Sequence, residues 1–157
     1  MSRPIGYLLS GLPCSGKSTY ARALAATGVV QLSLDDTMTQ RFGRPGKDYP
    51  GHLQPEQEPD VLRQLDQQLV DLLRAGVSVV LDHGLGRRDE RDRYKRLVTD
   101  AGAEWVLVRF DLDIDELLRR LQARNAEEAS GLLTEQTLRW MVETSEPPEG
   151  EGEIPAV

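Results

Sequence analysis

The stretch GLPCSGKST, residues 11–19, follows the apolar run IGYLLS, residues 5–10, and constrains the fold of this chain most. It matches G-x-x-x-x-G-K-[ST], the pattern of a loop that joins a buried strand to a helix and wraps backbone N–H groups around phosphate. Gly11 and Gly16 allow backbone conformations and close approaches that a Cβ would obstruct. The sequence therefore predicts a strand, a phosphate-binding loop and a helix at its start.

The side chains of this loop suit a nucleoside triphosphate. The N–H groups from about Cys14 to Thr19 are expected to point at phosphate oxygens, helped by the positive end of the following helix. Lys17 is expected to reach the β- and γ-phosphates and Ser18 to bind Mg²⁺, so the predicted cofactors are ATP and Mg²⁺. The predicted nucleotide-binding residues are Gly11, Pro13, Cys14, Ser15, Gly16, Lys17, Ser18 and Thr19. The alternative, a plain strand–turn–helix with a stray lysine, would match the full pattern only by chance.

Short apolar runs alternate with helical patterns along the chain. The runs are rich in Val, Leu and Ile, as in parallel strands covered on both faces, and lie at 5–10, 29–33, 77–82 and 105–110. Apolar residues at helical spacing predict helices at 18–26, 55–75, 88–101, 114–125 and 134–144. This alternation predicts an α/β fold with a mainly parallel sheet of about four to five strands.

The remaining segments are long connections and an acidic end. Residues 40–54 are rich in Gly and Pro, and residues 125–133 are small and acidic, so both are typical of lids or binding loops. The C-terminal stretch EPPEGEGEIPAV has the composition of a disordered segment. We therefore expect one domain over residues 1–146 and a disordered acidic tail over 147–157.

Charge and cysteine content narrow the possible partners. A net charge of −7 disfavours a long nucleic-acid footprint, which normally shows as a basic face. The single cysteine, Cys14, leaves no internal disulfide and fits a reducing compartment. No apolar run approaches the roughly 20 residues that span a bilayer, and no charged-then-apolar leader precedes the loop. We expect a cytoplasmic protein with no membrane partner.

Acidic residues follow two of the predicted strands. Asp35 and Asp36 come just after residues 29–33, and Asp82 ends the strand at 77–82. In a parallel sheet these strand ends share the edge where the phosphate loop lies and where ligands bind. A carboxylate there can accept the proton of a hydroxyl as phosphate is transferred. Alternatively, Asp35 and Asp36 are simply acids that open a helix.

These motifs resemble, over residues 5–148, the P-loop kinases, in particular the group of polynucleotide kinase, zeta toxin and chloramphenicol phosphotransferase, with small bacterial AAA-type ATP-binding proteins. The resemblance implies a P-loop NTPase three-layer αβα sandwich with strand order 2-3-1-4. It also implies that Asp35, the first of the paired acids, is the base. Asp82 then corresponds to a Walker B-type acid that holds a Mg²⁺-bound water or the acceptor.

The stretch DHGLGRRDERD, residues 82–92, resembles a D-H-G…R…R-D pattern found in many small bacterial members of the group. The acceptor-binding residues that this implies are Asp36, Asp82, His83, Arg88 and Arg91. The aromatic residues usual after the glycine are replaced here by Leu85 and Gly86. Alternatively, these arginines belong to a solvated helix face and pair with nearby acids such as Asp89 and Asp92.

Arg120 and Arg124 lie four residues apart on the helix expected at 114–125. In the family the helix that leads into the lid supplies arginines to the transferring phosphoryl group, which implies catalytic roles for Arg124 and then Arg120. The alternative for Arg120 is i,i+4 pairing with Glu116. The stretch Ser145–Pro148 matches three of the four positions of a Phe-Glu-Pro-Pro segment that lies near adenine in family members.

The function predicted from these features is transfer of the γ-phosphate of ATP, with Mg²⁺, to a hydroxyl of a small molecule. The catalytic residues would be Lys17, Asp35, Arg124 and Arg120. A polynucleotide 5′-hydroxyl kinase is the runner-up. A toxin-like kinase of sugar nucleotides and a regulatory module that binds ATP without transferring phosphate stay open.

Three other residues are of types that can contact a ligand. Trp105 and Trp140 are expected to be core or flanking residues rather than base-stacking ones. His52, in the loop at 40–54, is a candidate acceptor contact, although a lone loop histidine is more often solvated.

Overall fold

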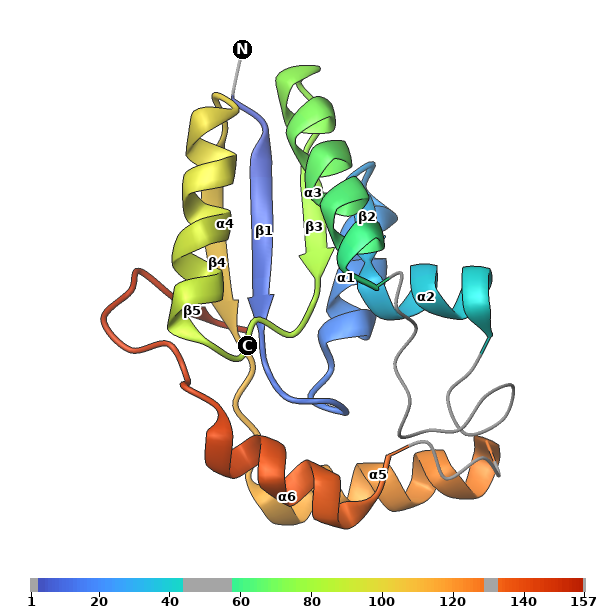
Figure 1. Ribbon diagram of the computed structural model, residues 1–157. Helices are drawn as coiled ribbons and strands as arrows, with labels where there is room; N and C mark the ends of the chain where they lie inside the picture. Colours follow the sequence, from blue (N-terminus) through green and yellow to red (C-terminus); the bar gives the residue numbers. More distant parts are fainter. Residues whose placement is uncertain (1–2, 44–57, 129–132, 157) are drawn as a thin grey trace.

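A five-stranded parallel sheet forms the centre of the molecule (Figure 1). This computed structural model describes residues 3–43, 58–128 and 133–156. The strands are β1 (Ile5–Ser10), β2 (Val30–Ser33), β3 (Val79–Asp82), β4 (Glu104–Arg109) and β5 (Ile154–Pro155). They lie in the order β2-β3-β1-β4-β5, and each pair of neighbours is parallel. The predicted α/β class and the order 2-3-1-4 are confirmed, with β5 added beside β4.

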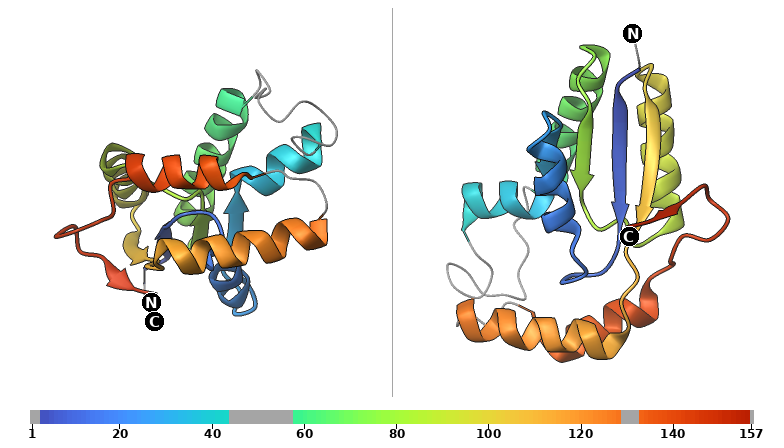
Figure 2. Two further views of the ribbon diagram at one scale, coloured as in Figure 1. Left: turned by 90° about the horizontal axis from the view of Figure 1, so that it is seen from below. Right: turned by 180° about the vertical axis from the view of Figure 1, so that it is seen from behind.

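Helices form the outer layers and a further layer beneath the carboxyl ends of the strands. They are α1 (Lys17–Ala25), α2 (Leu34–Phe42), α3 (Glu58–Arg74), α4 (Arg88–Asp100), α5 (Ile114–Glu128) and α6 (Glu135–Thr144). Figures 1 and 2 show α3 and α4 on one face of the sheet, α1 on the other, and α5 and α6 across the carboxyl ends of the strands. None of the helices in the described ranges is both long and apolar enough to cross a membrane.

The sheet is buried on both faces because successive strand residues point to opposite sides. Leu8 packs in one cluster, together with Leu81 of β3 and with Leu69 of α3. The next residue, Leu9, packs in the other cluster with Ala21 of α1. This two-sided burial explains why the strand sequences are continuous apolar runs instead of alternating patterns.

Parallel pairing brings the strand ends to one edge. Ser33 of β2 is in register with Asp82 of β3, and Ser10 of β1 is in register with Arg109 of β4. The loop that begins at Gly11 therefore leaves the sheet beside Asp82 and beside the start of α2. The fold positions the predicted site through this register.

The helix α2 was not among the predicted helices, although acids opening a helix were the alternative for Asp35 and Asp36. Ser33 caps its N-terminus, and the Ser33 Oγ accepts a hydrogen bond of 3.2 Å from the Asp36 backbone N–H. Asp35 and Asp36 occupy its first turn, where carboxylates suit the helix dipole. The rest of the loop expected at 40–54, with His52, lies outside the described residues. The helix α5 continues to Glu128, through the start of the connection expected at 125–133.

The C-terminal segment differs from the disordered tail that its composition predicts. The Arg91 Nε and Nη2 atoms donate to the two Glu151 carboxylate oxygens at 2.9 and 2.8 Å, and both side chains are at most 3% exposed. Beyond this ion pair, Val108 and Ile154 are in register in the parallel β4–β5 pair. The composition of this segment shows that it is acidic. It does not show that Arg91, a buried cation in a distant part of the chain, binds one of its acids. The boundary at residue 146 stays a prediction.

We expect Glu151→Ala to destabilise the protein strongly. The substitution leaves the Arg91 guanidinium buried without its carboxylate, and breaking a buried pair in this way typically costs about 3–5 kcal/mol. Urea denaturation followed by circular dichroism measures the change in the free energy of unfolding.

The matched control is Glu149→Ala. Glu149 is 83% exposed and lies 3.8 Å from Arg109, so about 1 kcal/mol or less is expected. Hydrogen bonds from Arg91 lower the pKa of Glu151 below its ordinary value of 4.5. The stabilisation that the Arg91–Glu151 pair provides is therefore complete above pH 4.5, the ordinary glutamate pKa, and is lost as the pH falls through the pKa of Glu151 in the folded protein. Equal losses from the two substitutions would contradict the packed tail.

Candidate active site

A cavity of about 1120 Å³ opens at the carboxyl edge of the sheet. Its walls come from the loop after β1, the first turns of α2, the loop after β3, and the helices α5 and α6. The predicted site residues that line it are Gly11, Pro13, Cys14, Gly16, Lys17, Ser18, Thr19, Asp35, Asp36, Asp82, His83, Arg120 and Arg124. Residues that are distant in the sequence thus meet around one space.

The loop from Gly11 to Gly16 has the backbone that an anion site needs. Gly16, at the N-terminus of α1, has φ +102°, a left-handed conformation that favours glycine. A Cβ built on Gly11 would lie 2.7 Å from the Ser15 Oγ and 2.8 Å from the Phe110 Cβ, so this position has no room for a side chain. No acidic residue lies in the first turn of α1, which leaves its positive end available to phosphate.

Lys17 lies at the centre of the loop's charges. Its Nζ donates to Gly11 O at 2.8 Å and to Leu12 O at 2.9 Å. Burial lowers the pKa of Lys17 below its ordinary value of 10.5, while the carboxylates of Asp82 and Asp35 act in the opposite direction. The ammonium group is therefore held close to the position where phosphate oxygens would lie.

Ser18 and Asp82 form the pair that would bind a magnesium ion. The Ser18 Oγ donates to the Asp82 Oδ2 at 2.8 Å, and the Asp82 side chain is buried. Within the described ranges no cluster of three or more His, Cys, Asp or Glu residues could hold a metal by itself. A hydroxyl and one carboxylate fit Mg²⁺, which in nucleotide sites keeps several waters and binds through few protein groups and the phosphates.

Ser15 is a predicted loop residue that does not line the cavity. Its hydroxyl oxygen is buried and has no hydrogen-bond partner among the residues that the structure describes. Buried polar groups are nearly always paired, so this hydroxyl fits a loop whose arrangement is completed by a ligand.

Asp35 faces the same group of charges from the first turn of α2. Burial raises its pKa above the ordinary value of 3.8; the Lys17 charge opposes this rise, and the Asp82 charge adds to it. A carboxylate with a raised pKa beside a phosphate site suits general-base chemistry, because it binds a proton more readily than an aspartate with the ordinary pKa does.

The arginines of α5 lie over the loop. The Arg120 Nη1 donates to Cys14 O at 3.3 Å, while its Nε donates to the Glu116 Oε1 at 3.0 Å. The Arg120 side chain therefore pairs with Glu116 on its own helix and contacts the phosphate loop at the same time. The charge of Arg124 acts on both Lys17 and Asp35, lowering the pKa of each.

His83 lies in the cavity wall with both ring nitrogens buried. Neither nitrogen has a hydrogen-bond partner within the described part of the chain. Its ring meets the edge of Tyr94 with centroids 6.0 Å apart. Burial lowers the pKa of His83 to about 4, so the imidazole is neutral at pH 7 and has one donor and one acceptor that no described residue pairs with.

Arg91 and Arg88 do not line the cavity, which corrects the expectation that they bind the acceptor. Arg91 is buried against Glu151, and its Nη1 donates to Leu85 O at 3.0 Å, so it supports the loop after β3 from behind. Arg88 is exposed and lies 3.9 Å from Asp92, the solvated arrangement that was the alternative. The preceding residue, Arg87, lines the cavity instead.

Sequence reasoning missed several other residues of the wall. They are Arg22, Ser33, Thr39, Gly84, Gly86, Trp140, Met141 and Thr144. Ser145, in the segment that the resemblance puts near adenine, also lines the wall. Arg22 could have been found, because it lies one helical turn after Ser18 and so on the same side of α1. The residues of α6 carry no comparable signal, since only the packing of α6 beneath the sheet brings them to the site.

Comparisons with known proteins agree with this architecture. The family profile described as an AAA domain matches residues 7–148. A search of curated protein sequences gave no match. A chain of the Pnkp1/Rnl/Hen1 RNA repair complex superposes with a TM-score of 0.73 at 22% identity, covering 98% of this chain and 50% of that one. This chain therefore spans about half the length of that protein.

Two further solved structures cover most of both chains. Kti12 of Chaetomium thermophilum, solved with ADP-AlF3, has a TM-score of 0.72 at 17% identity and covers 97% of this chain and 88% of that one. The Mycobacterium tuberculosis APS kinase CysC, solved with AMPPNP and APS, has a TM-score of 0.59 at 18% identity, covering 99% and 90% respectively. At these identities the likeness establishes a P-loop kinase-like fold.

We expect Gly11→Ala to weaken ATP binding. The added methyl group would force Ser15 or Phe110 to move, and overpacking of this kind typically costs about 1–3 kcal/mol, or roughly 5- to 150-fold in affinity. Isothermal titration calorimetry with AMPPNP and Mg²⁺ measures the change.

The control is Gly86→Ala in the wall of the same cavity. A Cβ on Gly86 meets nothing within 4 Å among the described residues, so nucleotide affinity should be preserved. Unchanged affinity in Gly11→Ala would show that the loop does not hold the nucleotide.

Proposed function

This chain belongs to the AAA domain family over residues 7–148, and on that basis we propose that it transfers the γ-phosphate of ATP to a hydroxyl group of a small molecule. The observation that carries the proposal is the meeting of Lys17, Asp82 and Asp35 in one cavity. Their charges act on one another although they come from three separate segments of the chain.

The donor half of the site consists of the loop from Gly11 to Thr19 and the start of α1. Backbone N–H groups and the Lys17 ammonium would bind the phosphates, and Ser18 with Asp82 would hold Mg²⁺. When bound, the ion neutralises charge on the β- and γ-phosphates. The neighbouring Asp82 and Asp35 carboxylates help to keep Lys17 charged despite its burial.

The transfer step uses Asp35 as the base. The acceptor oxygen forms a new bond to the γ-phosphorus, the bond to the bridging oxygen breaks, and its electron pair leaves with ADP. The hydroxyl proton passes to the Asp35 carboxylate, whose burial favours the protonated form. Arg124 and Arg120, which line the cavity from α5, offset the negative charge of the transferring group.

A small acceptor fits the charge and the size of the site. Asp36 and Asp35 both line the cavity, and their negative charges would repel a polynucleotide backbone. The cavity volume of about 1120 Å³ exceeds the 300–1,000 Å³ that is usual for a single ligand, which leaves room for an acceptor beside ATP. His83, Asp36 and Arg87 are the polar groups that would orient the acceptor.

We expect one class of hydroxylated compound to stimulate ADP release, and Asp35→Asn to remove that stimulation. The amide cannot accept the proton, and loss of a general base typically lowers the rate by about 10²- to 10⁴-fold. A coupled assay of ADP release with nucleosides, sugars, sugar nucleotides, hydroxylated antibiotics and 5′-hydroxyl oligonucleotides measures it.

Asp36→Asn is the comparison variant, and its effect on turnover should be smaller. Nucleotide affinity by calorimetry should be unchanged in both variants. If no acceptor stimulates ADP release, a module that binds ATP without transfer becomes the better account. Stimulation by oligonucleotides that weakens steeply with salt would favour a polynucleotide kinase.

The acceptor-dependent rate is expected to rise with pH on the acid side of its pH profile. The midpoint of this rise should lie above the ordinary aspartate pKa. Only the ionised Asp35 accepts a proton, and burial raises the pKa that governs its ionisation above 3.8. Initial rates measured from pH 4 to pH 8 test this. The rise should persist in Asp36→Asn and disappear in Asp35→Asn; a rise that survives in Asp35→Asn would assign the base to another group.

A further inference from the structure

Trp140 is an exposed aromatic residue in the wall of the cavity. Its exposure is 60%, whereas the other large hydrophobic residues of the described ranges, Ile154 excepted, are covered. It lines the main cavity and also a shallower one of about 620 Å³ on the outer side of α6. This exposure excludes the core position that was one of the two roles expected for Trp140 and leaves the position at the flank of the site.

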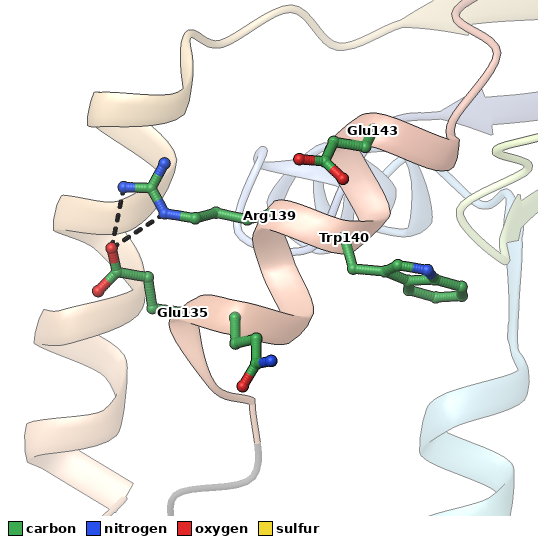
Figure 3. A pocket seen from close by; sticks show the side chains of 5 residues that line it. Glu135, Arg139, Trp140 and Glu143 are labelled. Atoms are coloured by element: carbon green, nitrogen blue, oxygen red, sulfur yellow. Dashed lines mark hydrogen bonds and ion pairs between the residues drawn. The ribbon is translucent and has the colours of Figure 1, made fainter.

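The two sides of α6 carry different chemistry. Met141 and Thr144 line the main cavity together with Trp140. The outer side carries the ion pair between Arg139 and Glu135, whose atoms Nη2 and Oε1 are 2.9 Å apart. Figure 3 shows the indole of Trp140 pointing away from this ion pair. The aromatic ring thus extends from the helix toward the main cavity.

Several contacts fix the position of α6. Leu138 is fully buried against Leu117 and Leu121 of α5. The Thr134 Oγ1 caps the N-terminus by accepting a hydrogen bond from the Thr137 N–H, and just beyond the C-terminus the Glu146 N–H donates to Gly86 O at 2.8 Å. The indole is therefore carried by a docked helix, which reduces the entropy cost of binding a ligand.

The proposed function places the acceptor beside His83 and Arg87, on the loop after β3. Figure 2, seen from below, shows α6 on the side of α3 and α4, with α5 between α6 and α1. The phosphate loop and Arg22 belong to the α1 side. The bond from Glu146 to Gly86 ties α6 to the loop that carries His83 and Arg87, the groups assigned above to the acceptor.

The chemistry around Trp140 suits a small ligand with a flat ring. An indole offers a large π face, and aromatic rings and bases stack on it in offset arrangements. Glu143 and the paired Glu135 line the shallower cavity on the outer side of α6, which disfavours a phosphate backbone running out over α6. The ligand is therefore expected to end near α6 rather than to continue across it.

We propose that Trp140 forms a stacking subsite for the acceptor, and that the acceptor is a small alcohol of the nucleoside class, whose flat ring lies on the indole while its hydroxyl points toward Asp35. The proposal rests on the proposed phosphotransfer and names the substrate class of that same site. Trp140 acts here by binding the ring and takes no proton.

The binding test uses the fluorescence of Trp140. The chain has two tryptophans, so Trp105→Phe leaves Trp140 as the only source of the signal. The protein is first saturated with AMPPNP and Mg²⁺ and then titrated with adenosine, guanosine, cytidine, uridine or glucose. We expect at least one nucleoside to quench the emission saturably and glucose to leave it unchanged. Saturating quench by AMPPNP alone would place the donor's base on Trp140 and overturn the proposal, as would no response to any nucleoside.

The kinetic test separates ring binding from catalysis. Loss of a base-stacking aromatic is expected to raise the KM for the nucleoside roughly 5- to 150-fold in Trp140→Ala, with the KM for ATP unchanged. Trp140→Phe should restore most of the affinity, which a merely structural role of the residue would not require. Gln136→Ala, on the outer side of α6, is the matched control and should leave the nucleoside KM unchanged.

The two proposals fail in different ways. Nucleoside quenching without any phosphate transfer would retain the stacking subsite and reject the reaction. Transfer to a nucleoside that is insensitive to Trp140→Ala would retain the reaction and reject the subsite. A 5′-hydroxyl oligonucleotide that binds more tightly than every nucleoside, with strong salt dependence, would overturn the small-acceptor class.

Discussion

The backbone hydrogen bond of 3.0 Å from the Gly11 N–H to Gly84 O joins the phosphate loop to the loop after β3, and the site depends on it. The next carbonyl along, Leu85 O, accepts bonds from the Ser10 Oγ and the Arg91 Nη1. These contacts join the loop after β1 to the loop after β3, and β1 and β3 are neighbours in the sheet. Gly11 itself has no room for a side chain, because a Cβ there would collide with the Ser15 Oγ and the Phe110 Cβ. The spacing between Lys17, Asp82 and His83 follows from this arrangement.

The charges of the site are balanced within the cavity. Burying the Lys17 ammonium alone would be costly, and the nearby Asp82 and Asp35 carboxylates offset part of that cost. Desolvation in the cavity raises the pKa of Asp35, and the Asp82 charge adds to the rise, which suits a group required to take up a proton. Such an arrangement of fixed charges and dipoles needs little reorganisation when charge moves during phosphate transfer.

The C-terminal segment reaches the same loop from two directions. Glu146 donates to Gly86 O at the end of α6, and Glu151 holds Arg91, which supports Leu85 O. The Lys95 Nζ also donates to Glu151 O at 2.8 Å and lies over the Trp105 ring. A segment whose composition is typical of disorder thus closes the ring of contacts around the site. The position of Trp140 follows from the same anchoring of α6.

The sequence by itself determined four strands of the sheet and the phosphate loop, because apolar runs and glycine spacing are local patterns. The resemblance over residues 5–148 implied the order 2-3-1-4, and only the structure added β5. The sequence also indicated that Asp35 and Asp82 would meet at one edge, since parallel strands end together, while the resemblance implied that the arginines of α5 reach the same site. Only the tertiary structure decided that Arg91 is paired with Glu151 while Arg87 lines the cavity, because local spacing does not show which side of a helix is buried. The same holds for Trp140: neighbouring residues do not distinguish a core tryptophan from one at a cavity wall, and the packing of α6 on α5 makes that choice.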